Sequence, residues 1–115
     1  MNVKAKGSAA EREVCEILTN RGYAAHRNPQ MFIGGKNNPD VSAEGLEAWH
    51  FEVKRVEALN VSAAFAQAAR DCAGKQPAVI HRKNREPWLI TIRFDDWLDM
   101  LHDDKIPFDD YDPWN

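Results

Sequence analysis

The chain contains 115 residues, of which 43% are apolar and 29% are charged. These values are typical of a soluble globular protein with a single hydrophobic core, and the length excludes a second one. No run of eighteen apolar residues is present to span a membrane, and no apolar segment of a secretory signal follows the N-terminus, so we expect a cytosolic protein. Cys15 and Cys72 lie far apart in helix-like segments, which argues against a disulfide framework or a zinc knuckle and indicates small buried residues.

The net charge of -3 is unevenly distributed. Residues 1–94 contain fourteen Lys and Arg against ten Asp and Glu, a balance of +4, whereas residues 95–115 contain Lys105 against eight Asp, a balance of -7. We therefore expect a mildly basic domain over residues 1–101, suited to phosphate contacts, and an acidic tail over residues 102–115. The tail is interpreted as a solubilising or electrostatically autoinhibitory segment, with a peptide for a protein partner as the alternative.

The first half of the chain predicts one helix followed by three strands. Apolar residues recur at helical spacing over residues 8–20, where Ser8 is a suitable N-cap and Asn20 with Gly22 ends the helix. A strand is expected over residues 23–27, followed by an irregular segment over residues 28–38 and a hairpin with strands over residues 40–43 and 48–55.

The second half predicts a helix, a second hairpin and a short final helix. Residues 62–73 carry an apolar stripe that ends at Gly74, and residues 77–81 and 88–92 are expected to pair. The final helix is expected to begin at Asp95 or Asp96 and to seal the core with Trp97, Leu98 and Leu101. The order α-β-β-β-α-β-β-α indicates an α/β fold with a mixed sheet and helices packed on it.

Pro39-Asp40 and Glu52-Val53-Lys54 carry the most informative polar side chains. A hairpin centred on Leu46 pairs residues whose numbers sum to 92, which places Asp40 directly opposite Glu52. Because side chains alternate along a strand, Glu52 and Lys54 share one face with His50, while the other face is formed by Trp49, Phe51 and Val53. Carboxylates opposed at roughly 4.5–5.5 Å between Cβ atoms are destabilising unless a cation neutralises them. Oxygen ligands favour Mg²⁺ or Mn²⁺ over zinc, so the pattern suggests metal-dependent phosphodiester cleavage.

Two further residues have alternative interpretations. Lys54 would orient the attacking water or stabilise charge in the transition state, or else form an ordinary salt bridge. Glu11 borders the apolar face of the first helix, where a third carboxylate would reach the metal. Ser8-x-x-Glu11 is also a capping box, and the residues alone leave these two roles for Glu11 equally open.

Candidate contacts to nucleic acid lie in two turns and on the second helix. Lys36 follows two glycines, and a basic turn contains Arg82, Lys83 and Arg85; both turns are suited to phosphates, although most charged turns are merely solvated. Gln67, on the flank of the second helix, would touch DNA or the metal site, with an exposed helix glutamine as the alternative.

In this order, Lys6-Gly7, Glu11-Arg12-Glu13, Pro39-Asp40 and Glu52-Val53-Lys54 resemble the PD-(D/E)XK nuclease superfamily over roughly residues 4–95. Within it, the chain looks most like archaeal and phage Holliday-junction resolvases. The resemblance implies a restriction-endonuclease-like core, with a central mixed sheet flanked by helices. It also implies that Glu11, Asp40 and Glu52 are acidic metal-site residues and that Lys54 is the catalytic lysine. A homodimer that cuts opposed strands of a junction, in DNA recombination or repair within a bacterial or phage-infected cell, is implied as well.

We therefore expect a Mg²⁺- or Mn²⁺-dependent endodeoxyribonuclease acting on branched DNA. Asp40, Glu52 and the backbone carbonyl of Val53 would hold the metal, Glu11 would contribute directly or through water, and Lys54 would assist the hydrolytic water. The alternatives are a repair or restriction-type endonuclease of duplex DNA, and a DNA-binding or partner-binding module without catalysis. The acidic set disfavours the module, because binding alone gives no reason to oppose two carboxylates.

Overall fold

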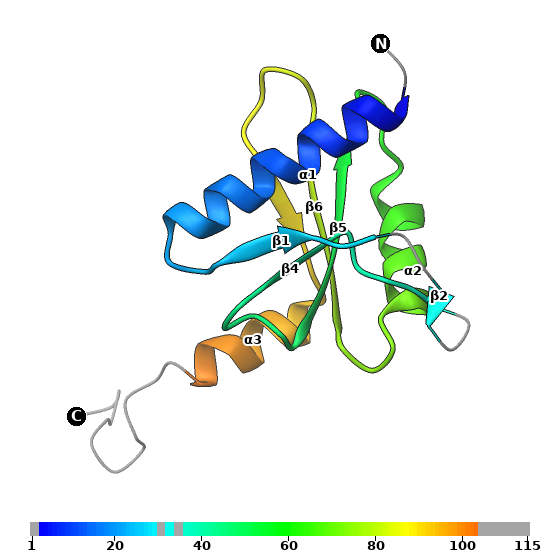
Figure 1. Cartoon of the computed structure of the whole chain (residues 1–115). Helices are drawn as coiled ribbons and strands as arrows, with labels where there is room; N and C mark the ends of the chain where they lie inside the picture. Colours follow the sequence, from blue (N-terminus) through cyan, green and yellow to red (C-terminus); the bar gives the residue numbers. More distant parts are fainter. Residues whose placement is uncertain (1–2, 30–31, 34–35, 104–115) are drawn as a thin grey trace, which may run out of the picture.

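The protein is described by a computed structural model that covers residues 3–29, 32–33 and 36–103. Within these residues, three helices and seven strands follow in the order α1 (Val3–Asn20), β1 (Ala25–Arg27), β2 (Phe32–Ile33), β3 (Lys36–Asn37), β4 (Val41–Ala43), β5 (Trp49–Arg55), α2 (Val61–Asp71), β6 (Gln76–Arg82), β7 (Leu89–Thr91) and α3 (Phe94–Asp103) (Figure 1).

Five strands form one mixed sheet in the order β1-β4-β5-β6-β7. β5 and β6 are parallel and are joined through α2, whereas the other neighbours in the sheet are antiparallel. The predicted α/β fold with a central mixed sheet is therefore confirmed. β2 and β3 form a separate two-stranded pair within the segment that was expected to be irregular.

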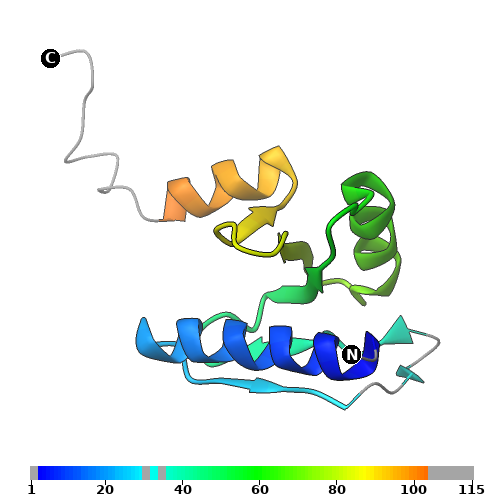
Figure 2. The same cartoon turned by 90° about the horizontal axis from the view of Figure 1, so that it is seen from above.

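The helices cover both faces of this sheet. Ala10 and Val14 of α1 belong to a core cluster with Phe51 and Val53, and a second cluster contains Ala64 and Ala68 of α2 with Val79 of β6. Figure 2 shows α1 on one side of β5, with α2 and α3 on the other. β5 is thus a central strand covered on both faces, so that its polar residues are buried along with its apolar ones.

The helix boundaries correct two expectations. α1 begins at Val3 rather than at Ser8, which lies in its interior. α3 begins at Phe94, so Asp95 and Asp96 lie in its first turn instead of capping it. By contrast, α2 has the expected ends within a residue or two: the side chain of Asn60 accepts a hydrogen bond of 3.0 Å from the amide of Ala63.

Of the apolar side chains of α3 that were expected to seal the core, Leu98 is half-buried, but Trp97 and Leu101 are exposed. Trp97 and Leu101 are 43% and 39% exposed, and Phe94 is 70% exposed while its ring stacks on that of Trp97. An amphipathic helix needs a covered apolar face, and the described part of this chain leaves the face of α3 largely open.

Cys15 and Cys72 are free and half-buried rather than fully buried. Within the described ranges, no helix combines the length and apolar character needed to cross a membrane.

Candidate active site

The β4–β5 hairpin has the register predicted from its turn. Val41 is the partner of Phe51, and the amide of Asp40 donates a hydrogen bond of 2.8 Å to the carbonyl of Phe51. The connection is closed by a glycine with positive φ at Gly45, which suits a left-handed turn position. Asp40 immediately precedes β4, and its side chain forms a hydrogen bond with that of Glu52, so the two residues that were expected to face each other do lie together.

Asp40 and Glu52 form a buried acidic pair, with 7% and 8% of their surfaces exposed. Burial raises the pKa of Asp40 to about 8, with further contributions from the charge of Glu52, a hydrogen bond to Glu52 and the charge of Glu11, against the lowering effect of the Val53 amide. Two like charges so close in a buried site cannot both persist, so one proton or one cation must be held between them. Without a cation, Asp40 carries that proton at neutral pH.

Val53 is tied to the same pair through its backbone. Its amide donates a hydrogen bond of 2.8 Å to Oδ2 of Asp40. In a strand, the N–H and C=O of one residue point to the same side, so the Val53 carbonyl also faces the β4 side, next to Asp40. Two carboxyl groups and a carbonyl form an all-oxygen donor set of the kind preferred by Mg²⁺ and Mn²⁺. The assignment of Val53 as a ligand stays a prediction that this placement favours.

His50 is a member of the site that the sequence interpretation did not assign. Its Nε2 lies 2.8 Å from Oε1 of Glu52, and only 1% of the residue is exposed. The two side chains stand two residues apart and contact each other, whereas Phe51 and Val53 pack with α1, in agreement with the predicted alternation. The alternation already placed His50 on the same face as Glu52. Its burial, however, depends on how the second face of β5 is covered, which the alternation does not show.

Glu11 approaches the pair from α1. Its Oε1 accepts a hydrogen bond of 3.0 Å from Nε of Arg27, whose Nη2 donates to Oγ of Ser8 at 3.0 Å. Since Ser8 lies inside the helix and its hydroxyl binds Arg27, the capping box is wrong. The charge of Glu11 reaches Asp40, where it raises the pKa. Nevertheless, in the described part of the chain no three His, Cys, Asp or Glu side chains are grouped closely enough for a ready-made metal cluster.

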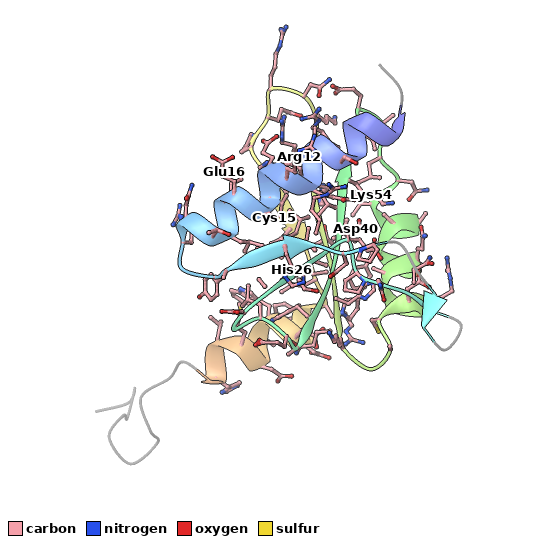
Figure 3. All side chains as sticks on the ribbon, viewed as in Figure 1. Arg12, Cys15, Glu16, His26, Asp40 and Lys54 are labelled. Atoms are coloured by element: carbon pink, nitrogen blue, oxygen red, sulfur yellow. The ribbon has the colours of Figure 1, made fainter. Side chains whose placement is uncertain are left out.

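Lys54 completes the predicted set on β5. It is half-buried and follows Glu52 by two residues, so both side chains leave the same face of the strand. Figure 3 shows the labelled side chains of Asp40 and Lys54 between α1 and α2 in that view. The catalytic role of this lysine stays a prediction.

In the basic turn between β6 and β7, one residue packs against the rest of the fold and two residues face solvent. Glu13 accepts hydrogen bonds from Arg82 at 3.1 Å and from Trp88 at 2.9 Å, and the Arg82 guanidinium lies 5.1 Å from the Trp88 ring. Arg82 is thus committed to the fold, which corrects its interpretation as a free phosphate contact. Lys83 and Arg85 are exposed.

The exposed part of this turn lies at the same end of the sheet as Lys54. Arg55, the residue after Lys54, is the register partner of Arg82, which immediately precedes the turn. The two remaining candidates for nucleic-acid binding are less defined: Gln67 is exposed on α2, and the side chain of Lys36 lies outside the described residues. Contacts of Lys36, Gln67, Lys83 and Arg85 with DNA stay predictions.

A mixed sheet with a buried pair of carboxylates on adjacent strands, and a lysine two residues after the second carboxylate, is the arrangement of PD-(D/E)XK nucleases. Comparison with known proteins agrees: the family described as "Phage putative PDDEXK endonuclease" matches residues 2–111, and the chain belongs to this family. No curated protein matches the sequence. Among solved structures, the fold is similar to Hjc, a Holliday junction resolvase from the archaeal hyperthermophile Archaeoglobus fulgidus. The TM-score is 0.54 and the identity is 22%, with 75% of this chain and 76% of that chain covered.

Proposed function

We propose that this protein is a divalent-metal-dependent endonuclease that cuts branched DNA, specifically four-way junctions, as a homodimer. The observation that carries the proposal is the buried pair of Asp40 and Glu52, opposed across β4 and β5 with Lys54 on the same face as Glu52. Such a pair costs stability in a protein that only binds DNA, because two carboxyl groups are desolvated without a permanent counter-charge. In a site that binds Mg²⁺ or Mn²⁺, the cation would supply this counter-charge.

The residues of the site have distinct tasks in this proposal. Asp40, Glu52 and the carbonyl of Val53 would hold the cation, which when bound supplies Lewis-acid activation of the phosphate and of a water. The ammonium group of Lys54 would orient the water and stabilise negative charge that develops on the phosphoryl oxygens. Glu11 would add negative charge at the edge of the site while Arg27 holds its carboxylate in place.

A second copy of the chain is the partner that we infer for the exposed apolar surface of β7 and α3. β7 is an edge strand in which Leu89 and Ile90 are 58% and 55% exposed, and α3 presents Phe94 and Trp97 beside it in the chain. One chain carries one acidic pair, whereas resolving a junction needs two opposed cuts. A two-fold dimer would supply the second site and cover this surface.

The substrate is tested by offering labelled four-way junction, fork, duplex and single-stranded DNA to the purified protein, with Mg²⁺, with Mn²⁺ and with EDTA. We expect the junction to be cut in two opposed strands with either metal and to remain intact in EDTA. Asp40→Asn serves as the inactive control. Preferential cutting of plain duplex would support the repair or restriction alternative, and binding without cutting in both metals would support the non-catalytic module.

The proposed site of action is the cytoplasm of a bacterial or phage-infected cell, in DNA recombination or repair. This setting follows from the phage endonuclease family and the similarity to a resolvase rather than from the residues of the site.

A further inference from the structure

His50 is the most deeply buried polar side chain of the site. It is 1% exposed, against 8% for its partner Glu52, and their separation of 2.8 Å is that of a short charge-assisted hydrogen bond. Burying an imidazole so completely costs free energy unless its polar atoms are satisfied. Neither the fold nor the proposed chemistry requires a histidine here, since apolar β-branched residues suit a covered central strand better.

The direction of the hydrogen bond follows from its partners. A carboxylate that ligates a cation is ionised and has no hydrogen to donate, so in the cation-bound site Nε2 of His50 would donate to Oε1 of Glu52. A carboxylate provides two oxygens and about four lone-pair positions, so accepting this bond leaves Glu52 with capacity to ligate a cation. The bond therefore constrains the rotation of the carboxylate and still leaves lone pairs on its oxygens for a cation.

His50 also lines a hollow between α2 and the segment before β4. This cavity of about 220 Å³ is lined by His50 together with Asn38, Pro39, Asp71 and Cys72, among others. His50 thus contacts the Glu52 carboxylate and also lines a space large enough for several waters. Removing the ring would connect that space to the acidic pair, which makes alanine a poor probe of the hydrogen bond.

We propose that His50 is a positioning residue for the metal-binding carboxylate of Glu52. By donating from Nε2 it fixes the carboxylate in the orientation that accepts a cation beside Asp40, and by filling the space next to the hollow it keeps water from competing for the same oxygen. Outer hydrogen bonds of this kind orient ligating groups, and their loss typically weakens metal affinity about 10- to 100-fold. This inference rests on the proposed function, because it presumes that Asp40 and Glu52 bind a divalent ion.

Two substitutions separate the hydrogen bond from the packing. His50→Leu keeps a side chain of similar volume but has no donor, whereas His50→Gln retains an amide N–H that reaches toward Glu52. Val14→Ala is the matched control, because it opens a cavity in the core beneath α1 and lowers stability while the side chains of His50, Asp40 and Glu52 are retained. Circular dichroism and thermal unfolding establish that each variant is folded.

The readout is the affinity for Mn²⁺, measured on the full chain from the paramagnetic resonance signal of the free ion. We expect His50→Leu to raise the dissociation constant about 10- to 100-fold, with His50→Gln within a few-fold of the parent and Val14→Ala unchanged. The Mg²⁺ concentration for half-maximal cutting of a four-way junction should shift in parallel.

Parent affinity in a folded His50→Leu variant would overturn the inference and leave the proposed function intact. Equal impairment in His50→Leu and His50→Gln would also overturn it, since packing of the ring rather than donation would then matter. A parent protein that neither binds Mn²⁺ nor cuts DNA would overturn the proposed function and the role of His50 together.

Discussion

Asp40 and Glu52 face each other across the end of the β4–β5 pair, and both are buried although they carry the same kind of charge. Their proximity is the main electrostatic cost in the described structure. In the metal-free protein a proton relieves this cost, as the raised pKa of Asp40 indicates. A cation and a proton therefore compete for the same place, which links stability, pH and metal binding.

The first prediction is that, in EDTA, the free energy of unfolding falls as pH rises. Asp40 has a pKa of about 8 in the folded protein against an ordinary value of 3.8, so the folded state binds more protons between these values. Its contribution is complete below about pH 4 and is lost as pH approaches 8, with a slope of up to about 1.4 kcal/mol per pH unit.

This slope is measured by chemical denaturation of the parent and of Asp40→Asn at pH 5, 7 and 9. The difference between the two proteins isolates Asp40, because the lowered pKa values of Glu13 and His81 act in the opposite direction in both. Saturating Mg²⁺ should reduce the fall in the parent. A difference that does not change with pH would contradict the prediction.

The second prediction concerns cleavage. Asp40→Asn, Glu52→Gln and Lys54→Ala should each lower the single-turnover cutting rate by about 10²–10⁴-fold while the protein stays folded. Asparagine at position 40 retains an acceptor for the Val53 amide, and it is neutral beside Glu52 without having to take up a proton, so at neutral pH the metal-free variant should be slightly more stable than the parent. Glu16→Ala, an exposed carboxylate on α1, serves as the control. Full activity of a folded Glu52→Gln variant would remove the acidic pair from the mechanism.

The third prediction concerns the two outward-facing residues of the basic turn. Replacing both Lys83 and Arg85 with alanine should weaken DNA binding and flatten its salt dependence by about one unit of log–log slope per lost phosphate contact. Arg21→Ala is the control, because it removes an exposed positive charge that directly follows α1 and lies outside the basic turn. Binding is measured at several ionic strengths by fluorescence anisotropy. An unchanged slope would mean that the turn is only solvated.

The fourth prediction is that the acidic tail opposes DNA binding. Truncation after Asp103, where α3 ends, removes four Asp and Lys105, a change of +3 in net charge. We expect tighter DNA binding at low salt and a smaller effect at high salt, where screening is short-ranged. Equal affinities at low salt would refute autoinhibition, and loss of the dimer on truncation would instead identify the tail as an assembly segment.

The fifth prediction concerns assembly. Ile90→Asp or Trp97→Asp should convert a dimer into monomers, because each places a charge in the centre of the surface that the second copy covers. Both side chains are exposed in the single chain, so the monomer fold should lose little stability. Asp99→Ala, on α3, is the control. Light scattering gives the mass, and a parent that is monomeric while it cuts both strands would contradict the dimer.

Much of the site was predictable because strands obey a strict alternation. The turn around Leu46 determines the register, the register places Asp40 opposite Glu52, and the two-residue period places Lys54 on the face of Glu52. The β-α-β order around α2 likewise indicated a mixed sheet. These features depend on local geometry that the residues specify by themselves.

Other features depended on which surfaces meet, and the sequence does not specify this directly. Ser8 and Glu11 fit a capping box equally well inside a longer helix, so the pattern could not locate the first turn of α1. Arg82 turns inward because Glu13 of α1 comes within 3.1 Å of it, an encounter between residues 69 positions apart. The burial of His50 beside Glu52 likewise depends on how the second face of β5 is covered, which the sequence of that strand does not specify.

The short connection between β4 and β5 has a consequence for how this chain can change in evolution. Its length sets which residue stands across from Asp40, although none of its own residues belongs to the proposed site. A single-residue insertion between Gly45 and Trp49 would bring Asp40 opposite a residue whose side chain points to the other layer, and the acidic pair would be lost in one step. We therefore expect natural relatives that retain nuclease activity to tolerate substitutions in this connection but not changes in its length.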